Sequence, residues 1–161
     1  MSTYPPCTTD VNGCITCSAV PSTPAVPATY TDSPVVGWNA GANSILVLDG
    51  DLYTTFGLPT RVTGIVLGFK SVRTFQSEPT LVQFGLYLSN IGGNQYVNVS
   101  EYGVQLTAPL LCAATDSFTI RRIAGVITYL RNSTILYTSL VPSAGPLLVN
   151  ACLYSSGDEI L

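Results

Sequence analysis

The residues best suited to chemistry in this sequence are its five cysteines, of which three lie within the first 17 positions. Cys14 and Cys17 have the C-x-x-C spacing of a metal knuckle or a redox pair, and Cys7 adds a third thiol. A tetrahedral zinc site needs a fourth ligand, which a neighbouring chain would have to supply. The alternatives are a disulfide within this segment and free or buried thiols. An odd number of cysteines leaves at least one unpaired within a single chain.

The carboxylates do not form a recognisable catalytic set. The chain contains no histidine, which excludes Ser-His-Asp and Cys-His nucleophile systems. Only Asp49 with Asp51, and Asp158 with Glu159, place two acids close together in sequence. Flanking Gly50, the first pair fits a tight turn better than a calcium site, which takes six or more oxygen ligands. We therefore expect the protein not to be an enzyme and to carry no cofactor.

Aromatic side chains offer a different kind of site, because their rings stack on sugars. The rings that could serve are those of Trp38, Tyr53, Tyr87, Tyr96 and Tyr102. Trp38, Tyr96 and Tyr102 are the candidate sugar-binding residues. In the competing interpretation, Trp38 anchors the N-terminal segment and the tyrosines lie at subunit contacts, where amphipathic rings are common.

The chain has few charges: 9% of its residues are Asp, Glu, Lys or Arg, against roughly 25% in an average soluble domain. Such a surface favours either packing against neighbouring subunits or a place in a durable particle outside the cytoplasm. In the alternative interpretation, Ser, Thr, Asn and Gln supply the solubility. The net charge of -3 argues against nucleic-acid binding. Apolar runs far short of ~20 residues argue against membrane insertion. The first residues lack the positive patch and apolar run of a signal peptide, so we expect synthesis in a cytoplasm.

Two regions differ in composition. Residues 1–34 hold six of the eleven prolines, spaced too closely for a helix and poorly for a central strand. This region is expected to be an extended arm, held by a neighbouring subunit or by the folded domain. Residues 35–161 have short alternating runs separated by Gly, Pro, Asn and Asp, which are typical of an antiparallel β domain.

The turn residues divide the second region into strands. Asp49-Gly50 is expected to form the turn of a hairpin between 44–48 and 51–56. Turns at Ala124-Gly125 and 131–133 predict a three-stranded meander, and 101–103 is interpreted as a bulge. The expected strands are 44–48, 51–56, 61–69, 81–89, 96–106, 117–123, 125–130, 134–139 and 147–154. Together they predict a two-sheet antiparallel sandwich of concanavalin-like or jelly-roll type.

Alternation within these strands predicts which side chains face the core. Val82, Phe84, Leu86 and Leu88 form one expected core-facing set, and Leu147, Val149, Ala151 and Leu153 form another. Arg121 and Arg122 are neighbours on one strand, so they are expected to point to opposite faces.

The meander also carries a resemblance. Phe118-Thr119-Ile120-Arg121-Arg122, Val126-Ile127-Thr128-Tyr129, Asn132 and Leu136-Tyr137-Thr138-Ser139 resemble the meander of concanavalin-like lectin/glucanase sandwiches in phage tail and other virion proteins. Gly145 to Val149 and Leu153 to Asp158 resemble the closing strand of those domains. The resemblance covers the last third of the chain. It departs where many such meanders have Asn-Gly and this chain has Asn132-Ser133, and it lacks the paired acids of the glucanases.

The resemblance implies a sandwich in a virion and does not imply a hydrolase. With the low charge, it predicts a structural component of a phage virion, as a tail, fibre or capsid-decorating protein. Such a component would assemble with copies of itself and other virion proteins, through its sandwich edges and its arm. The alternative is a carbohydrate-binding adhesin module of the virion that recognises a host surface glycan.

Overall fold

The structure, a computed structural model of the full chain, describes residues 7–9, 15–17, 37–38, 40–71, 78–155 and 157–160. The chain divides into two compact units, residues 1–31 and 32–161. In the first unit, β1 (Cys7–Thr9) and β2 (Ile15–Cys17) pair as a two-stranded antiparallel sheet. The prolines predicted only an extended arm here. Both strands lie between Pro6 and Pro21, in a stretch without proline, so nothing prevents their pairing.

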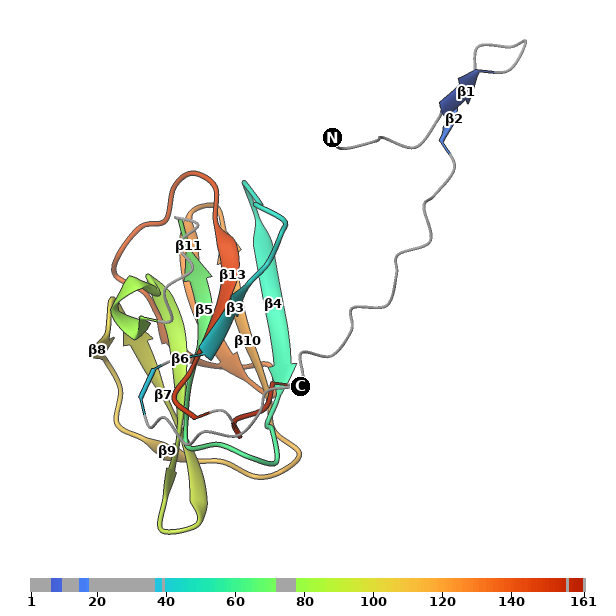
Figure 1. The fold of residues 1–161 in the computed structure, drawn as a ribbon. Helices are drawn as coiled ribbons and strands as arrows, with labels where there is room; N and C mark the ends of the chain where they lie inside the picture. Colours follow the sequence, from blue (N-terminus) through green and yellow to red (C-terminus); the bar gives the residue numbers. More distant parts are fainter. Residues whose placement is uncertain are drawn as a thin grey trace. The chain divides into compact units, whose positions relative to one another are not determined.

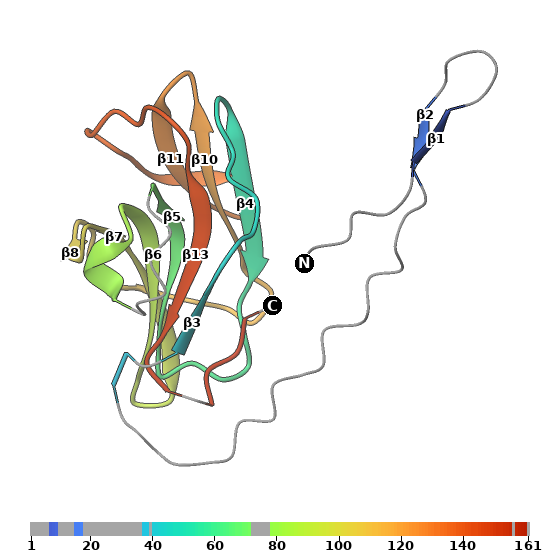
Figure 2. The same ribbon diagram turned by 45° about the horizontal axis from the view of Figure 1, so that its top comes forward.

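The second unit is a two-sheet antiparallel β-sandwich, as the strand pattern predicted (Figures 1 and 2). One sheet has four strands in the order β12-β11-β10-β4, which are Thr134–Thr138, Val126–Arg131, Ser117–Ile123 and Leu52–Gly57. The other sheet has seven strands. Its order is β3-β13-β5-β6-β7-β8, or Ala40–Asn43, Leu148–Leu153, Gly64–Lys70, Phe84–Ile91, Asn94–Glu101 and Val104–Gln105, and β9 (Leu110–Leu111) also pairs with β7.

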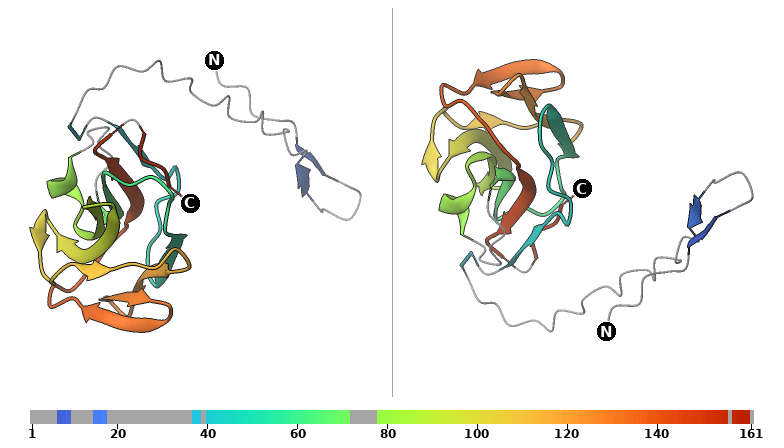
Figure 3. Two further views of the ribbon diagram at one scale, coloured as in Figure 1. Left: turned by 90° about the horizontal axis from the view of Figure 1, so that it is seen from below. Right: turned by 90° about the horizontal axis from the view of Figure 1, so that it is seen from above.

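Figure 3 shows the two sheets of the sandwich from its two ends. The core lies between these sheets and is built by side chains at alternate strand positions. The four-stranded sheet contributes Leu52, Phe56, Phe118, Ile120, Ile127 and Tyr129, and the seven-stranded sheet contributes Ile65, Leu67, Phe69, Phe84, Leu86, Leu88, Val97, Val99 and Ala151. Most of these side chains are completely buried. The predicted core set of β13 is confirmed, with Leu147 and Ala151 buried and Val149 and Leu153 packed against the core.

The prediction for β6 is confirmed at three of its four residues. Phe84, Leu86 and Leu88 lie in the core between the sheets. Val82 is also buried, but it precedes the strand and packs with Val66 and Cys152 on the outer face of the seven-stranded sheet. Alternation fixes a side-chain direction only while the chain stays in one strand, and β6 begins at Phe84.

The predicted meander is confirmed. The turns β10–β11 and β11–β12 use Ala124-Gly125 and Asn132-Ser133, all four at positive φ between 48° and 78°. Two residues at positive φ form the hairpin turn whose twist matches that of the strands. Asn132 also accepts a hydrogen bond from the Ser117 N–H with its Oδ1, at 2.9 Å.

The predicted hairpin around Asp49-Gly50 is wrong. Residues 44–48 form no strand, and only an isolated bridge joins Leu48 to Leu147. The strand that precedes this segment is β3, which pairs with β13 in the seven-stranded sheet, whereas β4 pairs with β10 in the other sheet. The intervening residues therefore cross between sheets. Gly50 does adopt the positive φ of a turn, at 73°.

The predicted bulge at 101–103 is a turn. Tyr102 and Gly103 have φ of 51° and 79° and join β7 to the short β8 as a hairpin. Gly92-Gly93 forms the corresponding turn between β6 and β7. Within the described ranges the only helical element is the 3₁₀ turn η1 (Pro79–Leu81), and no helix there is long and apolar enough to span a membrane.

Candidate functional site

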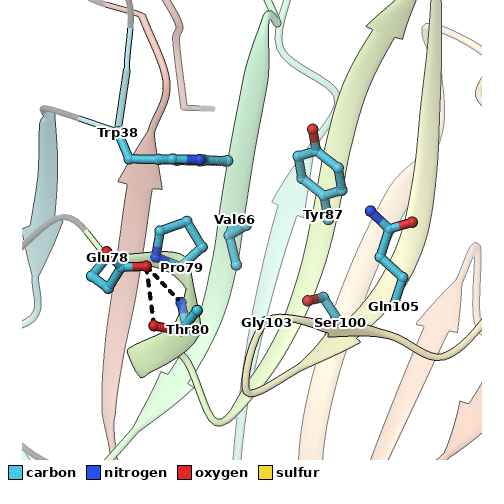
Figure 4. A pocket seen from close by; sticks show the side chains of 9 residues that line it. All are labelled: Trp38, Val66, Glu78, Pro79, Thr80, Tyr87, Ser100, Gly103 and Gln105. Carbon is cyan, nitrogen blue, oxygen red and sulfur yellow. Dashed lines mark hydrogen bonds between the residues drawn. The ribbon is translucent and has the colours of Figure 1, made fainter.

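A hollow of about 250 Å³ lies on the outer face of the seven-stranded sheet. Val66 of β5 and Tyr87 of β6 line it from the sheet, Ser100 of β7 and Gln105 of β8 lie on one side, and Trp38 lies across its other end (Figure 4). Residues Glu78, Pro79, Thr80 and Gly103 complete the lining. Because drug-sized ligands need roughly 300–1,000 Å³, this hollow suits one small unit such as a single sugar ring.

Aromatic contacts hold Trp38 in place. Its ring meets Tyr154 edge-on, with centroids 5.5 Å apart and an interplanar angle of 80°, and lies 6.0 Å from Tyr87. The Gly37 N–H donates to the Tyr154 carbonyl, which fixes the adjacent backbone. Gly64 lies beneath this pair: a Cβ there would be in ordinary contact with the Trp38 ring at 3.5 Å and in tight contact with the Tyr154 Cβ at 3.1 Å. Trp38 is thus a positioned aromatic wall of the hollow.

Polar groups come from both sides of the hollow. Glu78 accepts hydrogen bonds from the backbone N–H and the hydroxyl of Thr80, at 3.4 and 3.0 Å, which caps the η1 turn (Figure 4). Ser100 is buried, and Gln105 is exposed and stands opposite it in the β7–β8 ladder. Carboxylate, hydroxyl and amide groups beside an aromatic ring can bind a neutral polyhydroxylated ring.

On the same sheet face, the side-chain nitrogen of a buried asparagine has no hydrogen-bond partner. Asn98 is 2% exposed and stands opposite Tyr87 in the β6–β7 ladder. Its Nδ2 makes no hydrogen bond. A buried donor without an acceptor costs about 1–3 kcal/mol.

The three candidate sugar-binding residues do not come together. Only Trp38 lines the hollow, where its aromatic neighbour is Tyr87. Tyr96 is half-buried on β7 and pairs with Leu111 of β9. Tyr102 lies in the β7–β8 turn, with its ring 6.3 Å from that of Phe84. Sequence reasoning missed Glu78, Ser100 and Gln105, because they come from three separate elements and no spacing in the sequence links them.

The cysteines fall into two groups. Cys7 of β1 and Cys17 of β2 stand directly opposite each other in the ladder, whereas Cys14 lies outside the described residues. Cys112 and Cys152 lie in the sandwich and are not in a disulfide, and the Cys152 thiol donates to Oδ1 of Asn150 at 3.2 Å. Burial raises the pKa of Cys112 to about 11, so this thiol stays protonated at neutral pH and is a poor nucleophile. Where the structure describes the chain, no three His, Cys, Asp or Glu residues gather as metal ligands.

Asp49 and Asp51 have structural partners. Asp51 accepts a hydrogen bond from the Ala124 N–H at 2.7 Å, and Asp49 accepts one from the Gly50 N–H and lies 3.6 Å from Arg122. Arg122 is buried inside the sandwich end while Arg121 lies on the outer face of the four-stranded sheet, so their opposite directions are confirmed. These contacts tie the loop that carries both acids to β10 and to the turn after it.

The strands at the sheet edges share one property. The four-stranded sheet ends in β4 and β12, and the seven-stranded sheet ends in β3 and, at its other side, β8 and β9. Their sequences are LYTTFG, TILYT, AGAN, VQ and LL, without a charged residue or a proline. Charges and prolines are two of the means by which proteins prevent edge-to-edge pairing, beside short strands such as the two-residue β8 and β9. These edges lack both.

The fold defines the class of protein: a two-sheet antiparallel β-sandwich whose described edge strands are uncharged, with a small aromatic-walled hollow on one sheet. No protein-family model matches the chain, and a search of curated proteins finds none that is similar in sequence.

Proposed function

We propose that the protein is a structural component of a phage virion, in which copies associate through the uncharged edges of the sandwich and with other virion proteins. The observation that carries this proposal is the absence of charge and proline from every edge strand that the described part of the chain contains. An edge strand exposes unpaired N–H and C=O groups that another chain can satisfy. Repeated pairing of this kind builds a particle from one small subunit.

The placement of charged residues supports the same proposal. The chain has six Lys and Arg and nine Asp and Glu, fifteen in total. At least five of them are buried in the sandwich, namely Lys70, Glu101, Asp116, Arg122 and Asp158. At most ten therefore remain for the surface. Fewer surface charges reduce the electrostatic repulsion and the desolvation cost that would oppose close packing of identical subunits.

Exposed apolar side chains gather in connections at one end of the sandwich, the upper end in Figure 1. Ile45 to Leu48 lie between β3 and β4, and Leu140 and Val141 lie between β12 and β13. Ile45 is 86% exposed and Leu140 is 89% exposed. Hydrogen bonds from Arg122 to the carbonyls of Gly50 and Gly145 hold these two connections together. Such a surface gains stability when a second subunit covers it.

Sedimentation of the full chain tests the association. We expect the wild-type protein to sediment well above 17.0 kDa at micromolar concentration. Ile135→Lys adds a charge to the exposed side of edge strand β12, where the native side chain is 54% exposed. It should shift the distribution toward the monomer by at least tenfold in dissociation constant.

Thr115→Lys is the matched control, because it adds the same charge at an exposed position in the loop between β9 and β10, outside every edge strand. It should sediment as the wild type does. A wild-type protein that stays monomeric at high concentration contradicts the proposal, and identical behaviour of both variants contradicts the role of the β12 edge. Mass spectrometry of purified phage particles that carry the gene tests the virion setting directly.

A second candidate function is recognition of a host surface glycan, which the hollow at Trp38 favours. The hollow has an aromatic wall, a carboxylate, a hydroxyl and an amide within a volume close to that of one sugar ring. Arrayed glycans should bind the wild-type protein, and Gln105→Ala and Trp38→Ala should weaken that binding at least tenfold. Tyr53→Ala removes a 74% exposed ring on the other sheet and should leave binding unchanged. Equal effects of all three variants, or no binding to any glycan, contradict this candidate.

A further inference from the structure

We infer that Cys7 and Cys17 form a disulfide that closes the β1–β2 hairpin, and that Cys14 is not part of the pair. The ladder pairs Cys7 with Cys17, Thr8 with Thr16 and Thr9 with Ile15. Positions 7 and 17 therefore face each other directly and share one face of the ladder. The inference does not depend on the proposed virion role.

The register gives the right separation for a disulfide. Directly opposed residues of an antiparallel pair have Cα atoms about 4.5 or about 5.5 Å apart, depending on whether the pair exchanges hydrogen bonds. A disulfide requires a Cα separation of about 4.4–6.8 Å, so both kinds of pair meet the requirement. No other two cysteines stand opposite each other in any ladder of the described strands.

The conformation of β2 argues against the C-x-x-C alternative. Residues three apart approach each other in a helical turn, whereas a strand carries the chain forward by about 3.3 Å per residue. Ile15–Cys17 is a strand, so the chain that leads to Cys17 is extended and does not form the helical turn that C-x-x-C pairing uses. The residues paired with Cys17 belong to β1 instead.

The hairpin also needs a covalent link for stability. β1 and β2 form a sheet of two strands with three residue pairs, and no third strand joins them within the described segments. A lone two-stranded hairpin is marginally stable at best in water. Cys7 and Cys17 form the pair farthest from the turn, so a bond between them encloses the whole hairpin and removes the most freedom from its unfolded state.

Oxidised glutathione can serve as the oxidant for this bond. The thiolate of one cysteine attacks the glutathione disulfide, which releases one glutathione and leaves a mixed disulfide. The second cysteine then attacks the protein sulfur of that mixed disulfide and releases the second glutathione. In sum, the two S–H bonds of the protein and one S–S bond of the oxidant become one S–S bond of the protein and two glutathione thiols.

Thiol counting on the full chain tests the inference. Reduced protein is incubated with oxidised glutathione, quenched in acid, unfolded and labelled with N-ethylmaleimide, and its intact mass is measured. The chain has five cysteines, so we expect the reduced protein to take up five labels. The oxidised protein should take up three labels and carry no bound glutathione. The Cys14→Ser variant should also lose two labels on oxidation. Cys7→Ser and Cys17→Ser should lose none.

Four results would overturn the inference. These are no loss of labels in the wild type, a loss that persists in Cys7→Ser but disappears in Cys14→Ser, a glutathione adduct in place of the internal bond, and a covalent dimer on a non-reducing gel. Labelling of the reduced protein in the presence of Zn²⁺ distinguishes a zinc site at the N-terminal cysteines from a disulfide. Protection of all three N-terminal thiols that requires Cys14 would show a zinc site and also overturn the inference.

Discussion

Tyr129 donates its phenolic hydroxyl to Oε1 of Glu101 across the sandwich core, over 2.9 Å. Tyr129 lies on β11 of the four-stranded sheet and Glu101 at the end of β7 in the seven-stranded sheet, so the bond ties the two sheets together. Both side chains are buried. Burial, with Glu101 nearby, raises the pKa of Tyr129, so its hydroxyl stays protonated and remains a donor.

Removal of this donor should destabilise the sandwich. Tyr129→Phe keeps the ring but leaves the buried Glu101 carboxyl group without its hydrogen-bond donor, which we expect to lower the free energy of unfolding by about 2 kcal/mol. Tyr137→Phe is the control, because it removes the hydroxyl of a half-buried ring 6.2 Å away that does not reach Glu101. Its effect should stay below about 0.5 kcal/mol. Urea unfolding followed by Trp38 fluorescence gives both values, and equal effects would contradict the role of the bond.

Arg122 joins three chain segments at one end of the sandwich. Its Nε donates to the Gly50 carbonyl at 2.7 Å and its Nη1 donates to the Gly145 carbonyl at 2.6 Å, while Ser143 accepts at 3.3 Å. A lysine ammonium donates from one nitrogen only, so it cannot reach the acceptors that the separate Nε and Nη1 of the planar guanidinium reach. Arg122→Lys should therefore lower the free energy of unfolding by about 3 kcal/mol, because buried acceptors lose their donors.

The neighbouring arginine provides the control for Arg122→Lys. Arg121 lies on the same strand, is only partly buried and points to the outer face. Arg121→Lys should change the free energy of unfolding by less than about 1 kcal/mol. Chemical denaturation of both variants measures the difference. A larger effect at Arg121 would show that the loop contacts of Arg122 contribute little.

Acid should weaken the sandwich through Asp116. Burial alone would raise the pKa of this carboxyl, but hydrogen bonds from Arg131, the Ala113 N–H and Asn132 hold its pKa below the ordinary value. A lowered folded-state pKa stabilises the fold above the unfolded value of about 3.9, and this contribution is lost as pH falls through the folded-state pKa.

The pH dependence is measured by unfolding at pH 5 and at pH 2.5. The wild type should lose more stability over this interval than Asp116→Asn, whose side chain does not titrate. The variant should already be less stable at pH 5 by about 2 kcal/mol, because it lacks the charge that pairs with Arg131. Parallel pH profiles of the two proteins would contradict the assignment.

The sequence predicted the parts of the fold that depend on neighbouring residues. The meander was correct because the residues of each turn stand directly between two alternating strands, and a two-residue turn forces those strands to pair. The hairpin at Asp49-Gly50 was wrong because a turn residue does not reveal which sheet the next strand joins. Residues more than seventy positions away hold this turn by hydrogen bonds: Arg122 donates to the Gly50 carbonyl, and the Ala124 N–H donates to the Asp51 carboxylate.

The hollow depends on distant residues still more strongly. Trp38 was a candidate because its aromatic ring could stack on a sugar, but its partners arise from the register of β5, β6, β7 and β8. Glu78 reaches the hollow because it caps the η1 turn, and no hydrophobic periodicity in the sequence predicts that turn. Tyr96 and Tyr102 have the same chemistry as Tyr87, and only the three-dimensional register separates them.

A pair of strand glycines gives a sharp test of that register. Gly68 of β5 stands opposite Gly85 of β6, and a Cβ at Gly68 would lie 2.0 Å from the Phe84 carbonyl oxygen. Since that atom belongs to the backbone of the adjacent strand, Gly68→Ala must force the strands apart and should cost at least about 3 kcal/mol. Gly57 ends β4, and a Cβ there would meet nothing within 4 Å, so Gly57→Ala should change stability by less than about 1 kcal/mol. Thermal and urea unfolding compare the two variants, and a tolerated alanine at Gly68 would mean that β5 and β6 pair in another register.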